Sequence, residues 1–138
     1  MHDVGKLLIL NILTKLQDEK VEALSESREL MAELLEGNHE LLGLHVVQKW
    51  NLPAEFGVTT FCHDHHETLP DEYWAVLVHT ISLASALANV SGFGLGVTGR
   101  MSLVNHPSAS FLGFNDVKLA QIRVDIEDKV SALLDAAG

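Results

Sequence analysis

The sequence is poor in several kinds of residue, and each shortage excludes a class of protein. Only one of the 138 residues is cysteine, so no internal disulfide can form. Aromatic residues make up 6% of the chain and proline occurs three times, whereas leucine, alanine, valine and glutamate are abundant. This composition favours helices over strands. We therefore expect an all-α fold without a disulfide framework.

Positive charge is also scarce. Nine Lys and Arg residues stand against nineteen Asp and Glu residues, which gives a formal net charge of -10. A protein that binds a nucleic acid polymer needs a basic surface, so DNA and RNA are excluded as partners. The first ten residues lack a signal-peptide pattern, and no apolar run approaches the roughly 20 residues of a membrane span. We expect a cytoplasmic protein that does not enter a membrane.

Apolar residues are plentiful, and they recur at helical spacing. With 47% hydrophobic residues the chain can fill the core of one domain, which we assign to residues 1–138. Glycine and serine concentrate between residues 91 and 113, where we expect a loop with room for a short helical turn. The periodicity and the capping residues predict helices over 6–17, 19–25 (as a continuation or a bend), 27–36, 39–50, 53–66, 71–90 and from 116 onward.

Residues that bind transition metals fall close to the ends of these predicted helices. Helix ends can meet in one cleft, and a donor set rich in imidazole with one carboxylate suits Fe, Mn, Zn or Ni better than Ca or Mg. The candidate metal ligands are His2, Asp3, His39, His65 and His66.

Two neighbouring residues extend this set. Lys6 follows Asp3 by three residues, so it lies near the same helix face and could hold a phosphate oxygen. His63 precedes His66 by one turn and could join it. The simpler interpretation is that the histidines are hydrogen-bonded helix ends and a solvated polar loop, without a bound ion.

Four segments in order resemble one superfamily. Residues 2–6, His-Asp-Val-Gly-Lys, resemble the HD signature of the HD metal-dependent phosphohydrolases. Residues 38–43 resemble the His-x-x-x-Gly helix start of that superfamily, and 50–53 resemble the Trp-x-Leu-Pro of its HDOD branch, the HD-related output domains. Residues 65–67 are similar to the His-His-Glu element of HDOD and HD-GYP proteins. The resemblance spans roughly residues 2–90.

The resemblance implies a fold, a site and a chemistry. The fold would be an HD-type helical bundle of about five to seven helices. Bound divalent metals would activate a water for attack on a phosphoester. By similarity the metal ligands would be His2, Asp3, His39, His65 and His66, and the catalytic residues would be Asp3 and Lys6, with Lys6 contacting a phosphate.

The sequence also departs from the superfamily pattern. Ser85 stands where relatives usually have a metal-binding Asp, and a hydroxyl is a poorer donor than a carboxylate. No Gly-Tyr-Pro motif of the cyclic-di-GMP phosphodiesterases follows Glu67. The upstream helix that supplies a further ligand is not in this sequence, so we expect an N-terminally truncated domain.

These observations leave three hypotheses. The first is a non-catalytic or weakly catalytic signalling module of a bacterial type, which binds other signalling proteins, fused domains or a nucleotide around a degenerate metal site. The second is a metal-dependent phosphohydrolase that acts on a nucleotide or cyclic nucleotide. The third is a truncated domain that pairs as a homodimer to cover exposed apolar helix faces.

Overall fold

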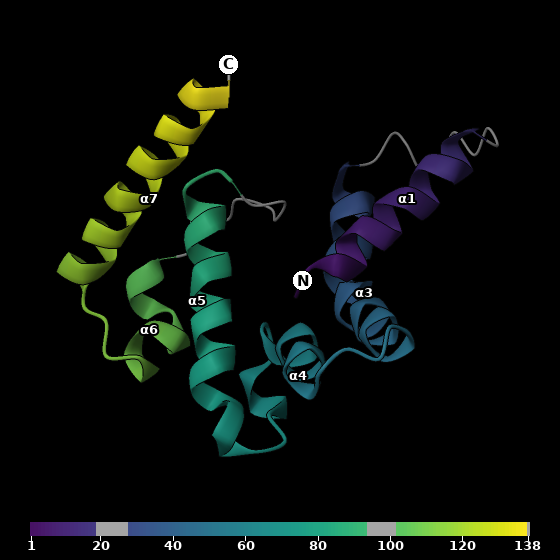
Figure 1. The fold of residues 1–138 in the computed structure, drawn as a ribbon, viewed down its shortest axis with the longest axis horizontal. Coiled ribbons are helices and arrows are strands. Elements are labelled where there is room, and N and C mark those ends of the chain that lie inside the picture. The colour runs from purple at the N-terminus through teal and green to yellow at the C-terminus, as the bar shows by residue number, and fades with distance from the viewer. Residues whose placement is uncertain (19–27, 94–101, 138) are drawn as a thin grey trace. The chain divides into compact units, whose positions relative to one another are not determined.

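The computed structural model describes residues 1–18, 28–93 and 102–137 (Figure 1). No strand occurs among these residues, so the prediction of an all-α fold is confirmed for them. The predicted helix over 19–25 and the glycines between 94 and 99 lie outside the described residues. The α-helices are α1 (Val4–Asp18), α3 (Arg28–Lys49), α4 (Ala54–Cys62), α5 (Ala75–Val90), α6 (Pro107–Phe111) and α7 (Asp116–Ala137), and the 3₁₀ helices are η1 (His66–Thr68), η2 (Glu72–Trp74) and η3 (Leu103–Asn105).

Helix α3 is continuous where the sequence predicted a break. The sequence analysis predicted one helix over 27–36 and another over 39–50, with Gly37 ending the first and Asn38 capping the second, but both residues lie inside α3. A hydrogen atom in place of a side chain at Gly37 costs only about 1 kcal/mol in a helix, and packing along the rest of α3 can offset it. The Asn38 side chain donates to the Leu34 carbonyl at 3.1 Å instead of capping. His39 therefore lies in the middle of a helix, not in a first turn.

Helix α4 ends earlier than predicted. Its start agrees with the sequence analysis, because α3 ends at Lys49 and Asn51 adopts a left-handed φ of 50°, which stops a helix. Its end does not agree, because the helix stops at Cys62 and not near His66. His63 is thus the first residue beyond α4, and the chain leaves the α-helix there before the short 3₁₀ helix η1 begins at His66.

The chain divides into two compact units, Met1–Ile81 and Ser82–Gly138. Helix α5 begins in the first and ends in the second. In the second unit, α7 starts as predicted, because the Asn115 side chain accepts a hydrogen bond from the Lys118 amide at 2.9 Å. The hydrophobic core of the second unit consists of Leu83, Leu87, Ala109 and Leu119, with Leu103, Leu112, Phe114, Ile122 and Ile126 packed against them.

In the first unit, α1 crosses α3 at two glycines (Figure 1). A Cβ atom added to Gly5 would lie 1.9 Å from the His39 carbonyl oxygen and 2.8 Å from the backbone nitrogen of Gly43. The sequence analysis did not assign a role to Gly5. Only glycine permits this approach of two backbones, and the approach brings the start of α1 against the middle of α3.

One segment among the described residues, Glu72–Val90, is long and apolar enough to cross a membrane by length and composition. This corrects the expectation that no run approaches that length. The core helix of a globular protein meets the same criterion, and Val78, Leu83 and Leu87 of this segment are buried against other parts of the chain. Since 33% of the window is buried within the chain, length and composition alone are weak evidence for a membrane span.

Candidate metal centre

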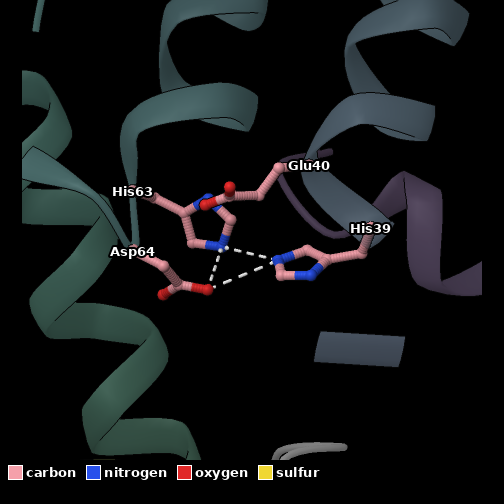
Figure 2. Close-up of side chains that lie close together, drawn as sticks. All are labelled: His39, Glu40, His63 and Asp64. Atoms are coloured by element: carbon pink, nitrogen blue, oxygen red, sulfur yellow. Dashed lines mark hydrogen bonds and ion pairs between the residues drawn. The ribbon is translucent and has the colours of Figure 1, made fainter. Parts of the chain in front are cut away.

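Three donor atoms, one on α3 and two just after α4, form a triangle in the first unit (Figure 2). Nε2 of His39, in α3, lies 3.4 Å from Nε2 of His63, just after α4. Oδ2 of Asp64 lies 3.4 Å from each of these two nitrogens. Both imidazoles are almost wholly buried, whereas the Asp64 side chain is partly exposed. The cluster therefore opens to solvent on the Asp64 side.

Backbone carbonyls fix the protonation of both rings. Nδ1 of His39 lies 3.0 Å from the carbonyl oxygens of Leu35 and of Glu36, and Nδ1 of His63 lies 3.1 Å from that of Thr60. A carbonyl oxygen only accepts hydrogen bonds, so each Nδ1 carries a hydrogen and donates it. In the neutral rings each Nε2 therefore carries no hydrogen, and its lone pair is directed into the triangle.

The three atoms of the triangle are therefore all acceptors when the imidazoles are neutral. Two nitrogen lone pairs and a carboxylate oxygen at 3.4 Å repel one another unless a cation lies between them. Either a proton or a metal ion can provide this positive charge. A backbone carbonyl that accepts the second ring hydrogen is also the usual arrangement around metal-binding histidines.

The start of α1 adds a second group of donors next to the first. His2, Asp3 and His63 each offer a donor atom within 4.8 Å of the others. The two Asp3 oxygens face different partners, because Oδ2 lies 3.1 Å from Nε2 of His2, and Oδ1 lies 3.9 Å from Nε2 of His39 and 3.8 Å from Nε2 of His63. Asp3 is thus placed to complete the triangle as a fourth donor.

Lys6 is buried beside this carboxylate. Its Nζ lies 3.0 Å from Oδ1 of Asp3 and 3.7 Å from Oε1 of Glu36, in α3. The side chain is only 5% exposed. Its charge is therefore compensated within the protein by two carboxylates.

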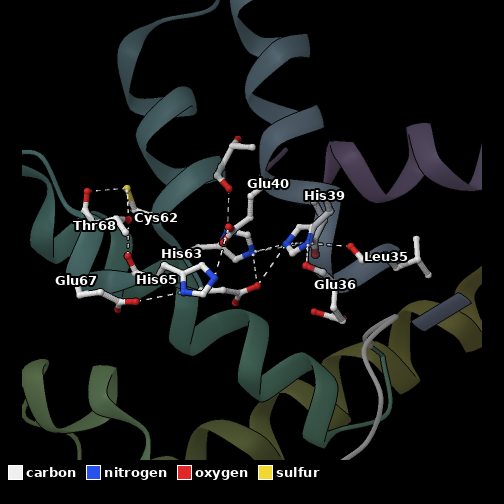
Figure 3. A network of polar contacts seen from close by, with 12 residues as sticks. Leu35, Glu36, His39, Glu40, Cys62, His63, His65, Glu67 and Thr68 are labelled. Carbon is white, nitrogen blue, oxygen red and sulfur yellow. Dashed lines mark hydrogen bonds and ion pairs between the residues drawn. The ribbon is translucent and has the colours of Figure 1, made fainter. Parts of the chain in front are cut away.

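Glu40 contributes a carboxylate to the same cluster as His39, His63 and Asp64. Its Oε1 atom is buried and has no hydrogen-bond partner among the described residues. Oε2 lies 3.8 Å from Nε2 of His65, whose Nδ1 lies 3.3 Å from Oε1 of Glu67 (Figure 3). An unsatisfied buried carboxylate oxygen is costly unless a cation or a proton compensates it.

His65 and His66, which the sequence analysis selected, take other positions. His65 is exposed and bridges Glu40 and Glu67. His66 begins η1 and stacks on His79, with ring centroids 4.5 Å apart and planes 17° apart. Neither belongs to the two donor groups found among the described residues.

Burial and neighbouring charges shift the pKa values of the cluster in opposite directions. Burial alone would lower the pKa of His39, but the Asp64 carboxylate outweighs it and raises that pKa. At His63 burial prevails and lowers the pKa. Burial would raise the pKa of Asp3, but contacts with His2 and Lys6 hold it well below its usual range. Of the two buried imidazoles, His39 therefore takes up a proton more readily than His63 when no metal is bound.

The structure thus brings together His2, Asp3 and His39 of the predicted ligands, and adds residues that the sequence analysis did not select. His63 had been considered only as a neighbour of His66, and Glu40 and Asp64 had not been considered. One signal was present in the sequence: His63-Asp64 repeats the His-Asp pair of residues 2 and 3. The assignment of metal ligands remains a prediction.

The comparison with protein families bears on this part of the chain. Residues 1–66 match the HDOD domain. The HDOD match includes α1, α3, α4 and the donor triangle, and it confirms the resemblance over these residues. No curated protein and no solved structure matches the chain.

Proposed function

We propose that this chain is an HDOD-type signalling module that binds a divalent transition metal, Fe, Mn, Zn or Ni, and acts by binding a partner protein or a small ligand rather than by hydrolysis. The observation that carries the proposal is the triangle of His39, His63 and Asp64, in which three acceptor atoms converge. The HDOD match over residues 1–66 supports the module.

The dimensions of the triangle suit a metal ion. Bonds of about 2.1 Å from a tetrahedral ion to nitrogen and oxygen ligands place those ligands about 3.4 Å apart. The three separations among the His39, His63 and Asp64 donor atoms are each 3.4 Å. Asp3 would supply the next donor, and the unsatisfied Glu40 oxygen lies in the same group. When bound, such an ion would supply a positive charge that polarises an attached water or ligand.

Two features favour binding over hydrolysis. The buried ammonium of Lys6 is already paired with Asp3 and Glu36, which leaves it poorly placed to hold the phosphate of a substrate. Ser85 stands at a position where hydrolytic relatives of the HD type usually have an Asp. Ser85 belongs to the second unit, so this point depends on the sequence alone.

The experiment that tests the proposal is metal analysis of the full chain purified without chelators. We expect a transition metal in the wild type, loss of that metal in His63→Ala and Asp64→Asn, and retention in His45→Ala. His45 is a matched control, because this histidine of α3 is exposed and lies outside the cluster. A metal-free wild type would contradict the proposal.

The same proteins distinguish the alternatives. Turnover of a phosphodiester such as bis(p-nitrophenyl) phosphate, lost in His63→Ala, would favour a metal-dependent phosphohydrolase over a signalling module. Loss of the metal in His65→Ala with retention in His63→Ala would favour the ligand set that the family resemblance implied. We expect neither result, because His65 is directed toward Glu40 and Glu67.

A further inference from the structure

Lys6 is a charged side chain inside the protein, next to the proposed metal position. A buried ammonium ion costs several kcal/mol unless it is compensated. Here Asp3 from the start of α1 and Glu36 from α3 compensate it, at 3.0 and 3.7 Å. The two helices thus form a second, separate cation position, which the Lys6 ammonium fills.

The Asp3 carboxylate connects this position to the donor triangle. The same Oδ1 atom that forms the ion pair with Lys6 faces Nε2 of His39 at 3.9 Å and Nε2 of His63 at 3.8 Å. Asp3 therefore stands between the ammonium and the triangle. A bridging carboxylate stands in the same way between two metal ions that share it.

His63 limits the number of ions that the donor groups can hold. The two groups share His63, which has one nitrogen available, since its Nδ1 donates to the Thr60 carbonyl. A single lone pair binds a single ion. His63 can therefore bind a metal ion in only one of the two donor groups at a time.

The charges around the site also favour a single metal ion. The surroundings hold four carboxylates, those of Asp3, Glu36, Glu40 and Asp64. One divalent ion together with the Lys6 ammonium nearly neutralises them. A second divalent ion would in addition lie close to the Lys6 ammonium, and the two positive charges would repel each other.

We propose that the Lys6 ammonium replaces a second metal ion, so that the site holds one divalent ion and Lys6 sets that number. This inference rests on the proposed metal-binding function. Removing the charge and the volume of Lys6 would leave the Asp3 and Glu36 carboxylates as donors around an empty position. A second ion could then enter, with Asp3 as the bridge.

The test measures bound Mn²⁺ in the full chain, by elemental analysis after excess metal is removed and by electron paramagnetic resonance. We expect one ion in the wild type, one in Lys6→Arg, which keeps the charge, and two in Lys6→Ala. The control is Lys15→Ala, because Lys15 lies in the same helix but is exposed. Two ions bridged by Asp3 would also give an exchange-coupled spectrum in place of the six-line spectrum of an isolated ion.

The outcomes separate this inference from the proposed function. Two ions in the wild type, or one in Lys6→Ala, would overturn the inference and leave metal binding intact. No ion in the wild type would overturn the proposed function itself. If Lys6→Ala does not fold without metal, it is refolded with excess Mn²⁺: recovery with two ions supports the inference, and no recovery contradicts it. Loss of inorganic phosphate binding in Lys6→Ala with one ion still bound would identify Lys6 as a phosphate ligand instead.

Discussion

At the scale of single residues, the cluster depends on where hydrogens are held. The backbone carbonyls of Leu35, Glu36 and Thr60 fix the hydrogens of two imidazoles on Nδ1 and leave two lone pairs directed at one carboxylate. Sequence analysis could propose histidines as ligands, but it could not select His63 over His65. His63 directly follows the last residue of α4 and is buried, whereas His65 lies beyond the helix end and is exposed. The sequence predicted that this helix continues to residue 66, so it could not separate the two.

We expect metal affinity to fall as the pH is lowered, with His39 as the group that responds first. The pKa of His39 is raised, so its protonation begins to compete with the metal above the ordinary imidazole value of about 6.5. The pKa of His63 is lowered, so His63 competes only at lower pH. Between the two, affinity should fall about tenfold per pH unit. Competition of the protein with a chelator for Zn²⁺ over pH 5–8 measures this slope, and a flat profile would contradict it.

Gly5 is the residue on which the crossing of α1 and α3 depends most directly. A methyl group at this position would lie 1.9 Å from the His39 carbonyl oxygen, which is backbone and cannot turn aside. We expect Gly5→Ala to lower the free energy of unfolding by about 3 kcal/mol, at the upper end for overpacking, and to weaken metal binding. Urea denaturation measures the first effect. Unchanged stability would mean that the helices do not cross this closely.

At the scale of elements, the helices were predicted better than their ends. The stop after Trp50 was recognised because Pro53 suits the start of the next helix. The structure adds that Asn51 ends α3 with a left-handed φ of 50°. The break at Gly37 was wrong because a glycine inside a helix costs little, and the contacts of the whole element decide the outcome. Local signals thus identify an element reliably only when no tertiary contact opposes them.

Gly37 gives a test of this account of α3. Nothing lies within 4 Å of a Cβ atom added at this position, and the residue is exposed inside a continuous helix. We expect Gly37→Ala to raise the free energy of unfolding by about 1 kcal/mol through helix propensity alone. The same urea denaturation measures it, so this variant is also the matched control for Gly5→Ala. A loss of stability would indicate that α3 is interrupted there.

At the scale of the whole molecule, the chain has two compact units, and the donor residues and the apolar core cluster lie in different ones. The first, Met1–Ile81, contains the donor residues, and residues 1–66 of it match the HDOD domain. The second, Ser82–Gly138, has an apolar core of its own around Leu83 and Leu87. The all-α class followed from composition, whereas the division into units depends on contacts that composition does not specify.

The close approach at Gly5 also changes what the His2–Lys6 segment signifies. Its histidine and aspartate offer donors and its lysine a charge, but its glycine serves the contact between two backbones. A protein that shares this segment therefore shares the contact between two helices as well as the residues that could bind a metal ion. A descendant could lose every ligand and still keep the glycine, so the signature alone traces descent more surely than it reports a bound ion.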